Sequence, residues 1–305
     1  MLHVATFTAD RINETIDAIN SKGFGLTFGL HTRIDDRVQQ IIDRIQVGNV
    51  YVNRNQIGAV VGSQPFGGEG KSGTGPKAGG PNYLPCFYAP EVSTINMQSS
   101  AERASGNPID EATVTAALNQ LQPSVSPLTS DNTTQVAALG RMAEAVNVEL
   151  RSIEVDWLLP GPTGESNRLS LHPRGRIIVL ADTAADGIQQ SVDALIAGCA
   201  VLMVITEDSE LDSIISESAK ALPLTIISGA FPIESLASMN NIDAVALSGS
   251  VAQALAVKKI LAQRQDAIMP LIFTGGTPHR YTVERHVCID TTAAGGNATL
   301  LASAE

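Results

Sequence analysis

Glycine is concentrated in one short stretch of this sequence, in a pattern that could present main-chain groups to a ligand. Seven of the fourteen residues from 67 to 80 are Gly, and they follow a strand-like run at 47–52. Glycine adopts backbone angles closed to other residues and lets the main chain approach another group closely. The embedded Gln64-Pro65-Phe66 and Pro76-Lys77 argue against a freely flexible linker. We therefore expect an ordered loop whose backbone N–H groups bind something.

Two short motifs invite a phosphate-binding interpretation. Gly70-Lys71-Ser72 ends like a phosphate loop, but Pro65 stands where the first Gly of that motif is needed. The following Gly73-Thr-Gly-Pro76 cannot begin the helix whose N-terminus would meet the phosphate. Ser248-Gly-Ser250 lies at an expected strand-to-helix turn, but it lacks the G-x-G-x-x-G fingerprint and an acidic residue after the next strand. We expect nucleotide-fold geometry there without nucleotide binding.

Side chains that could bind a metal or act as a nucleophile are scattered. No His residue has metal-ligand spacing, and no Cys has the pairing of a zinc site or a disulfide framework. Cys199 lies in an apolar run before a strand, which predicts an inert buried thiol. We therefore nominate no catalytic residue, no cofactor-binding residue and no metal ligand. The residues considered are His3, His31, His172, His279, His286, Cys86, Cys199 and Cys288.

Composition excludes several classes of protein. Among the 305 residues 44% are hydrophobic and 4% aromatic, which is typical of α/β proteins with buried aliphatic strands. The formal net charge of −11 argues against nucleic acid or an anionic membrane as the main partner. No run approaches the roughly 18 apolar residues of a transmembrane helix, and the N-terminus has no basic region or signal-peptide core. A reducing cytoplasm is the expected location.

Hydrophobic periodicity predicts alternating strands and helices. The first residues, 2–7, are expected to form a strand, followed by helices near 10–22 and 35–47 and a buried extended segment at 24–31. A strand at 92–97 and helices near 110–121 and 133–150 follow. In the second half, the pattern predicts right-handed crossovers and a parallel, doubly wound sheet. The expected strands there are 176–180, 200–205, 224–227, 244–247 and 269–273, with helices near 187–197, 210–221, 235–240 and 251–263, and a strand-like 287–289.

Several longer segments of the sequence resemble a known family. Residues 23–34, 47–62, 64–70 and 72–81 are similar to the C-terminal part of an aldehyde dehydrogenase, and a further matching segment is Thr291-Thr-Ala-Ala-Gly-Gly-Asn297. Together they resemble the bifunctional proline utilisation A enzymes, which join proline dehydrogenase to L-glutamate γ-semialdehyde (1-pyrroline-5-carboxylate) dehydrogenase. Ser63 and Lys71 depart from the expected Val and Leu.

The resemblance implies an aldehyde anchor loop. In it, the backbone N–H groups of Gly58 and Ala59 would hold the α-carboxylate of L-glutamate γ-semialdehyde, and Phe66 would form one wall of an aromatic box around its aliphatic part. The family's nucleophilic Cys, in a Gly-Gln-Arg-Cys context, is absent, and Phe273 stands where a catalytic Glu would precede Thr-Gly-Gly. No cofactor is therefore expected in this chain, whereas NAD and FAD are expected in the full-length enzyme.

The resemblance also divides the chain. Residues 1–98 would be the C-terminal segment of an aldehyde dehydrogenase domain, 99–108 a linker, 109–286 a degenerate Rossmann-like domain that does not bind NAD, and 287–305 a terminal tail. The last two parts would cover the dehydrogenase site, help to seal the substrate tunnel and contribute to a homo-oligomer. The expected partner is the remainder of the polypeptide. Two alternatives stay open: a stand-alone interaction or oligomerisation protein, and a nucleotide-binding protein that uses Ser248-Gly-Ser250.

Overall fold

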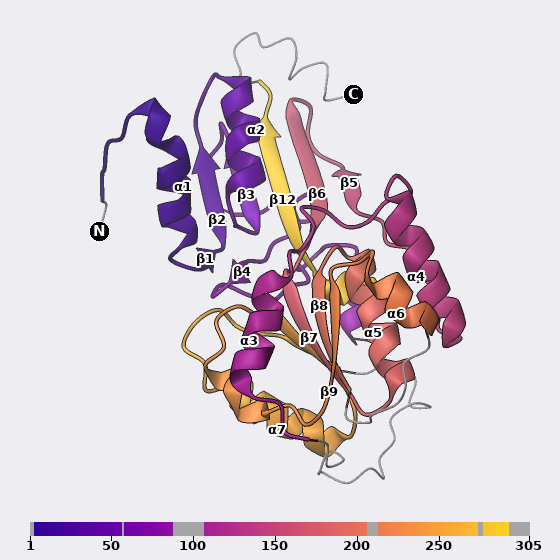
Figure 1. The fold of residues 1–305 in the computed structure, drawn as a ribbon. Helices are drawn as coiled ribbons and strands as arrows, with labels where there is room; N and C mark the ends of the chain where they lie inside the picture. The colour runs from indigo at the N-terminus through magenta and orange to yellow at the C-terminus, as the bar shows by residue number, and fades with distance from the viewer. Residues whose placement is uncertain (1–2, 57, 88–106, 206–212, 274–276, 293–305) are drawn as a thin grey trace.

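Two five-stranded sheets organise the molecule, one above the other in Figure 1. The structure, a computed structural model, describes residues 3–56, 58–87, 107–205, 213–273 and 277–292. A small antiparallel pair, β1 (Phe24–Gly25) and β4 (Glu69–Gly70), comes from the first part of the chain. In Figure 1 it lies between the two sheets. The sheet drawn lower in Figure 1 is entirely parallel, whereas the upper sheet mixes parallel and antiparallel pairs.

The parallel sheet has the spatial order β11-β10-β7-β8-β9. Its first strand in the chain is central, and the later strands extend to either side of it, which is the doubly wound order of Rossmann-like folds. The α/β class predicted from the sequence is confirmed. The strands are β7 (Arg176–Ala181), β8 (Ala200–Ile205), β9 (Leu224–Ser228), β10 (Ala244–Ser248) and β11 (Leu271–Phe273).

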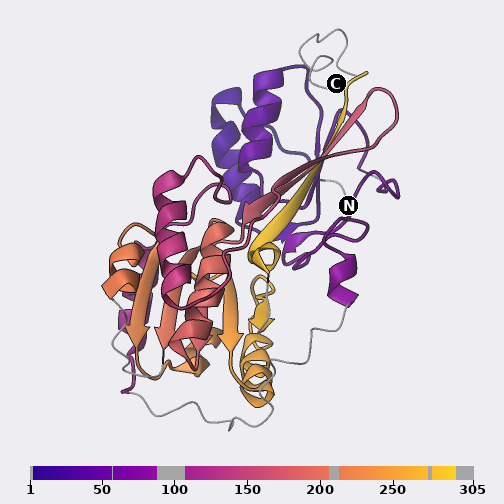
Figure 2. The same cartoon turned by 90° about the vertical axis from the view of Figure 1, so that its right-hand side faces the viewer.

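Helices cover both faces of this sheet (Figures 1 and 2). Side chains alternate along each strand, so Ile177 and Val179 join one core cluster while Ile178 and Leu180 join the other. All four side chains are fully buried, as expected for a strand covered on both faces. One face packs against α4 (Thr133–Ala145), α5 (Ala184–Ile196) and α6 (Ser213–Ala219), and the other against α3 (Glu111–Gln120), the 3-10 turn η4 (Ile233–Ala237) and α7 (Val251–Leu261).

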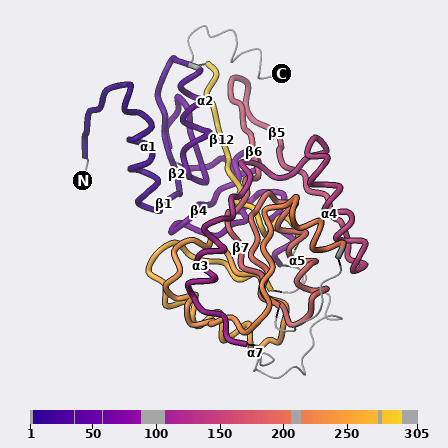
Figure 3. The backbone as a smooth tube through the Cα atoms, viewed as in Figure 1, coloured from indigo at the N-terminus to yellow at the C-terminus, as the bar shows by residue number. Residues whose placement is uncertain are grey.

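The mixed sheet joins the two ends of the chain. Its order is β2-β3-β12-β6-β5, so the last described strand lies between a strand of the first 60 residues and a hairpin from the middle of the chain. β12 is parallel to β3 and antiparallel to β6; the yellow strand runs beside these partners in Figures 2 and 3. The strands are β2 (Thr27–Leu30), β3 (Asn49–Val52), β5 (Asp156–Leu159), β6 (Glu165–Pro173) and β12 (Thr282–Asp290).

The two faces of the mixed sheet differ in polarity. One face carries aliphatic side chains of β3 and β12 that pack against α1 (Ile12–Asn20) and α2 (Asp35–Arg44). The opposite face is polar yet buried, and it faces the glycine-rich segment. A buried polar face must find hydrogen-bond partners, so it is a place where a loop can be held in one shape. Its buried residues are Asn49, Tyr51, Asn167, Glu284, His286 and Cys288, together with Leu169 and Leu171 of β6.

Several local predictions are wrong. Residues 3–8 form no strand, and Val4 and Phe7 are 81% and 54% exposed, because no neighbouring strand pairs with them among the described residues. The segment 24–31 is extended but not buried, since Phe24 is 65% exposed and β2 is an edge strand. The helix expected to reach residue 150 ends at Ala145. The predicted strand at 92–97, most of the linker and residues 293–305 lie outside the described residues.

Candidate functional site

The glycine-rich segment is fixed to the polar face of the mixed sheet by buried donors. The Asn49 amide on β3 donates to the carbonyls of Gly67 and Leu26, each at 2.9 Å. Lys77 is 1% exposed, and its Nζ donates to the same Gly67 carbonyl and to Asn49 Oδ1 at 3.2 Å. A Cβ placed on Gly48 would lie 2.0 Å from the Gly67 oxygen, so only Gly permits this approach. The segment is therefore a shaped loop and not a linker.

A carboxylate of β12 holds the other end of the segment. Glu284 accepts a hydrogen bond from the Lys77 backbone N–H through one oxygen and from the Asn82 amide, at 2.8 Å, through the other. Beside it, Arg285 pairs with Glu69 at 3.1 Å, and both side chains are at most 16% exposed. Burial lowers the pKa of Lys77 to about 8, although Glu284 and Glu69 oppose the shift. The cation and the carboxylates thus join the loop to the end of the chain.

The predicted anchor residues Gly58 and Ala59 lie on an open turn. Gly58 has φ +75° and is exposed, and a Cβ there would meet nothing within 4 Å. In the part of the chain that the structure describes, neither the Gly58 nor the Ala59 N–H has a hydrogen-bond partner. The next two side chains, Val60 and Val61, are 46% and 99% exposed. Two main-chain donors are thus available to a ligand at a surface that is partly apolar.

Phe66 lies on the same loop, beyond the turn. Its N–H donates to the Ala78 carbonyl at 3.0 Å, and it accepts from the Ala78 N–H at 2.9 Å, so two short segments of the loop pair here. The side chain is half-buried. No ring contact or hydrogen bond joins Phe66 to Gly58 or Ala59 among the described residues. Its role as an aromatic wall remains a prediction.

Sequence reasoning missed the side chains that brace this turn. Gln64 is 4% exposed; its Oε1 accepts from the Val60 N–H at 3.0 Å, and its Nε2 donates to Glu165 Oε1 at 2.8 Å. Arg54 donates to Glu165 Oε2 at 2.9 Å and to Cys288 Sγ at 3.2 Å. In the sequence, only the position of Gln64 beside Pro65 pointed to this contact. Glu165 lies 101 residues after Gln64, so no local pattern connects the two.

The buried thiols are not activated. Burial raises the pKa of Cys288 to about 11 even though Arg54 donates to its sulfur. Burial likewise raises the pKa of Cys199 to about 11, as expected for an inert core thiol. His286 is fully buried, and neither of its ring nitrogens has a hydrogen-bond partner among the residues that the structure describes. Its pKa is lowered to about 4 by burial and by nearby Lys77. This arrangement can hold a ligand through backbone donors, and it offers neither of these thiols as a thiolate at neutral pH.

The helix start at Ser248-Gly-Ser250 has features that disfavour a dinucleotide. Ser250 caps α7 because its side chain accepts from the Gln253 N–H, and the Gln253 side chain accepts from the Ser250 N–H, so two of the donors that would meet a phosphate are occupied. The Gln253 amide also donates to the Asp182 carboxylate after β7, at 3.4 Å. On the adjacent α5, Thr183 caps the helix and Asp186 lies in its first turn. These carboxylates would repel a pyrophosphate at the edge where strand order reverses.

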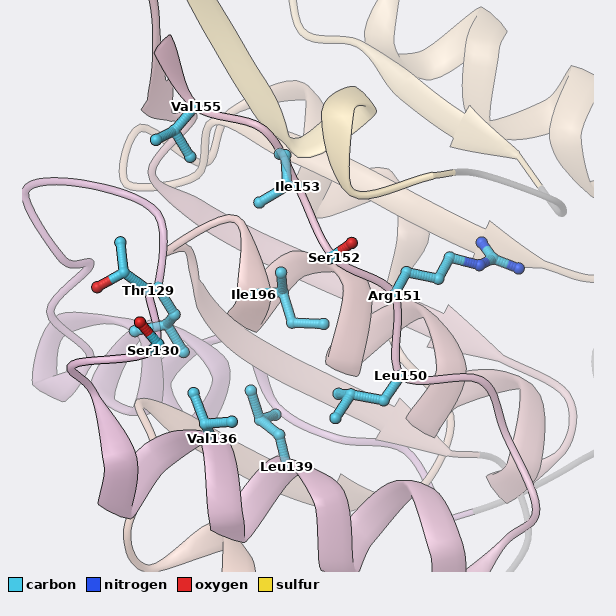
Figure 4. A pocket seen from close by; sticks show the side chains of 11 residues that line it. Thr129, Ser130, Val136, Leu139, Leu150, Arg151, Ser152, Ile153, Val155 and Ile196 are labelled. Atoms are coloured by element: carbon cyan, nitrogen blue, oxygen red, sulfur yellow. The ribbon is translucent and has the colours of Figure 1, made fainter.

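A separate cavity of about 420 Å³ lies beside α4 (Figure 4). Its lining is mainly aliphatic, and Figure 4 shows the Arg151 side chain leading away from Val136, Leu139 and Ile196. Arg151 instead pairs with Glu149 at 2.9 Å and Asp193 at 3.3 Å. None of the predicted anchor residues lines this cavity, so it is distinct from the loop.

Two further searches of the described ranges are negative. They contain no group of three or more His, Cys, Asp or Glu residues that could hold a metal ion. None of their helices is long and apolar enough to cross a membrane.

Comparison with known proteins supports the resemblance. Residues 3–92 match the model of the aldehyde dehydrogenase family. The "Bifunctional protein PutA" of Escherichia coli (strain K12) is 37% identical over 318 residues, which cover 99% of this chain and 22% of that protein. The chain is related to the PutA proteins. The PutA of Rhizobium meliloti is 33% identical, over 99% of this chain and 23% of that protein.

Two further matches cover a shorter relative and a solved structure. The "1-pyrroline-5-carboxylate dehydrogenase" of Bacillus licheniformis is 42% identical over 81 residues, 27% of this chain and 16% of that protein. A solved PutA structure from Corynebacterium freiburgense superposes with a TM-score of 0.44 at 21% identity, over 91% of this chain and 24% of that one. The resemblance stated from the sequence is confirmed. The chain spans about a fifth of the length of its PutA relatives.

Proposed function

We propose that this chain is the C-terminal portion of a PutA-type enzyme. In that enzyme it would contribute the aldehyde anchor loop to NAD-dependent oxidation of L-glutamate γ-semialdehyde to glutamate, a step of proline catabolism. The backbone N–H groups of Gly58 and Ala59 would bind the substrate's α-carboxylate, and Phe66 would flank its aliphatic part. The remainder of the polypeptide would supply the nucleophile.

One observation carries this proposal. Among the described residues, the N–H groups of Gly58 and Ala59 lack partners, on a turn whose neighbouring residues are braced by partly buried hydrogen bonds. Preformed main-chain donors bind an anion without reorganising, which is why such concave backbones recur at anion sites. The match of residues 3–92 to the aldehyde dehydrogenase family, and the names of the PutA relatives, supply the chemical class of the anion.

The second part of the chain has a structural role in this proposal. It would cover the dehydrogenase site, help to seal a substrate tunnel and contribute to assembly into a homo-oligomer. The shared mixed sheet supports this, because β12 and β6 hold the second part directly against the anchor loop. The sites for NAD and FAD would lie in the remaining polypeptide, and the two occupied N–H donors at the start of α7 support this. The proposed location is the cytoplasm.

Kinetics of the complete enzyme carrying this sequence test the proposal. Ala59→Pro removes one N–H donor, whereas Ala59→Gly keeps it and serves as the matched control. A hydrogen bond to a charged group contributes about 1.5–3 kcal/mol, so Ala59→Pro should raise the KM for the aldehyde by about 10- to 100-fold. The KM for NAD should stay within about twofold, because the dinucleotide does not use this donor.

Two results would separate this proposal from its rivals. An unchanged aldehyde KM in Ala59→Pro, with the variant folded, would remove the anchor role. Turnover of glutamate semialdehyde by the purified 305-residue chain alone would contradict the need for the remaining polypeptide. Stable binding to an unrelated enzyme, with no effect of Ala59→Pro, would favour the stand-alone interaction protein.

A further inference from the structure

A single carboxylate from the second part of the chain contacts both ends of the anchor turn. Glu165 is the first residue of β6, and its side chain is 15% exposed. Its Oε1 accepts from Gln64 at 2.8 Å and from Asn167 at 2.9 Å, and its Oε2 accepts from Arg54 at 2.9 Å. Arg54 precedes the anchor turn and Gln64 closes it. Glu165 therefore bridges the start and the end of the segment that contains Gly58 and Ala59.

Gln64 links this carboxylate to the turn through its side-chain hydrogen bonds. Because its Nε2 donates to Glu165, its Oε1 is directed at the Val60 N–H and accepts a hydrogen bond from it at 3.0 Å. The Gln64 N–H also donates to the Val60 carbonyl at 2.9 Å, so Val60 is held through both of its backbone groups. Val60 directly follows Ala59. Fixing the Val60 peptide restricts the direction of the adjacent Ala59 N–H.

Arg54 fixes the opposite end. Asn53 turns the chain with φ +58° and accepts from the Thr32 N–H at 3.0 Å, which places Arg54 against the sheet. The Arg54 guanidinium lies 5.3 Å from the centre of the Tyr51 ring and is 17% exposed. Without Glu165, this half-enclosed cation would lose its carboxylate partner, and its position would change. Charge-assisted bonds of this kind are stronger and more directional than neutral ones.

We propose that Glu165 is a positioning residue for the aldehyde anchor: through Gln64 and Arg54 it holds the Gly58 and Ala59 N–H groups in the geometry that binds a carboxylate. This rests on the proposed function of the loop. Glu165 lies outside residues 3–92, the part that matches the aldehyde dehydrogenase family. The second part of the chain thus controls substrate affinity, beyond covering the site. In this proposal the effect acts on binding, because Glu165 contacts the two ends of the turn through Gln64 and Arg54.

The test compares variants of the complete enzyme carrying this sequence. Glu165→Gln keeps the shape but removes the charge and reverses part of the hydrogen bonding; we expect a roughly 10-fold higher KM for the aldehyde, since about one charge-assisted hydrogen bond is lost. The kcat and the KM for NAD should stay within about twofold. Asp156→Asn is the matched control, because Asp156 pairs with exposed Arg168 on the same hairpin. That variant should leave all three constants unchanged.

A double-mutant cycle with Gln64→Met adds a readout that general destabilisation would not give. If Glu165 acts through Gln64, the double variant should have about the same aldehyde KM as the single variant with the higher KM. Independent effects of the two substitutions would multiply. If Glu165→Gln fails to fold, Gln64→Met alone decides, because it leaves the Arg54–Glu165 pair in place; a KM unchanged from wild type would overturn the proposal.

The outcomes distinguish this inference from the one on which it depends. A raised KM in Ala59→Pro, together with an unchanged KM in folded Glu165→Gln, would overturn the positioning role and leave the anchor intact. An unchanged KM in both variants would remove the anchor role and the positioning role together. A lower melting temperature of Glu165→Gln with no change in KM would show that Glu165 stabilises the fold only.

Discussion

The buried His286 gives a quantitative prediction about acid stability. Its side chain is fully buried between Asn49 of β3 and Leu169 of β6, and in the described part of the chain neither ring nitrogen has a hydrogen-bond partner. Burial, reinforced by Lys77, lowers its pKa from 6.5 to about 4, so the folded state excludes the proton that the unfolded chain binds. Stability is therefore fully present above pH 6.5 and is lost as the pH falls through 4. Linkage puts the loss at about 2 kcal/mol by pH 5.

Denaturant unfolding of the chain at several pH values measures this loss. Between pH 7.5 and pH 5, His286→Leu should lose about 2 kcal/mol less unfolding free energy than the wild type, because the leucine does not titrate. At pH 7.5 the variant should be at least as stable as the wild type, since the replaced ring makes no hydrogen bond. His172, whose pKa is lowered to about 4 mainly by burial, is present in both proteins and cancels in the comparison.

The exposed His31 provides a control for this experiment. His31→Gln removes an exposed histidine and is the control for losing a histidine from the chain. If His286→Leu and the wild type lose the same unfolding free energy over this range, His286 is not held neutral in the fold. That result would contradict its burial on the polar face of the mixed sheet.

Three further predictions concern the packing and the chemistry of the chain. Gly48→Ala should destabilise by about 1–3 kcal/mol in thermal unfolding because its Cβ would meet the Gly67 carbonyl at 2.0 Å, whereas Gly140→Ala in α4, where a Cβ meets nothing within 4 Å, should stabilise by about 0.5–1 kcal/mol. Equal effects of the two would contradict the close approach of the loop. A thiol reagent should label exposed Cys86 in the native chain and reach Cys199 and Cys288 only after unfolding, and fast native labelling of all three would show that the buried thiols are accessible. Calorimetry of the chain with NAD should show no binding, because the helix start at Ser250 is capped by its own side chains; micromolar affinity would restore the nucleotide-binding alternative.

The parallel sheet was predictable from local pattern, and the mixed sheet was not. Each strand of the parallel sheet is a short run of aliphatic residues followed by a helix, so its identity is local. The hairpin β5–β6 was missed because polar residues alternate with Leu169 and Leu171 along β6, a weak signal for a strand with one buried face. The placement of β12 between β3 and β6 depends on pairing across the whole chain, which no local pattern encodes.

The candidate site divides in the same way. The glycine-rich segment and its anchor residues could be nominated because glycine density and the family resemblance are visible in the sequence. The partners that brace it could not, since Glu165 and Glu284 contact the loop from strands about 100 and 200 residues away. Lys77 was singled out only as part of a stiff dipeptide, and its burial beneath Gly67 depends on the small size of Gly48.

The central claim is that two backbone donors of this chain bind the carboxylate of an amino-acid aldehyde. The most direct test is a crystal structure of the complete PutA-type enzyme carrying this sequence, with the product L-glutamate bound. We predict an α-carboxylate oxygen about 2.7–3.2 Å from the backbone nitrogens of Gly58 and Ala59. A bound glutamate whose α-carboxylate is held by other groups, with these two N–H groups facing water, would contradict the account.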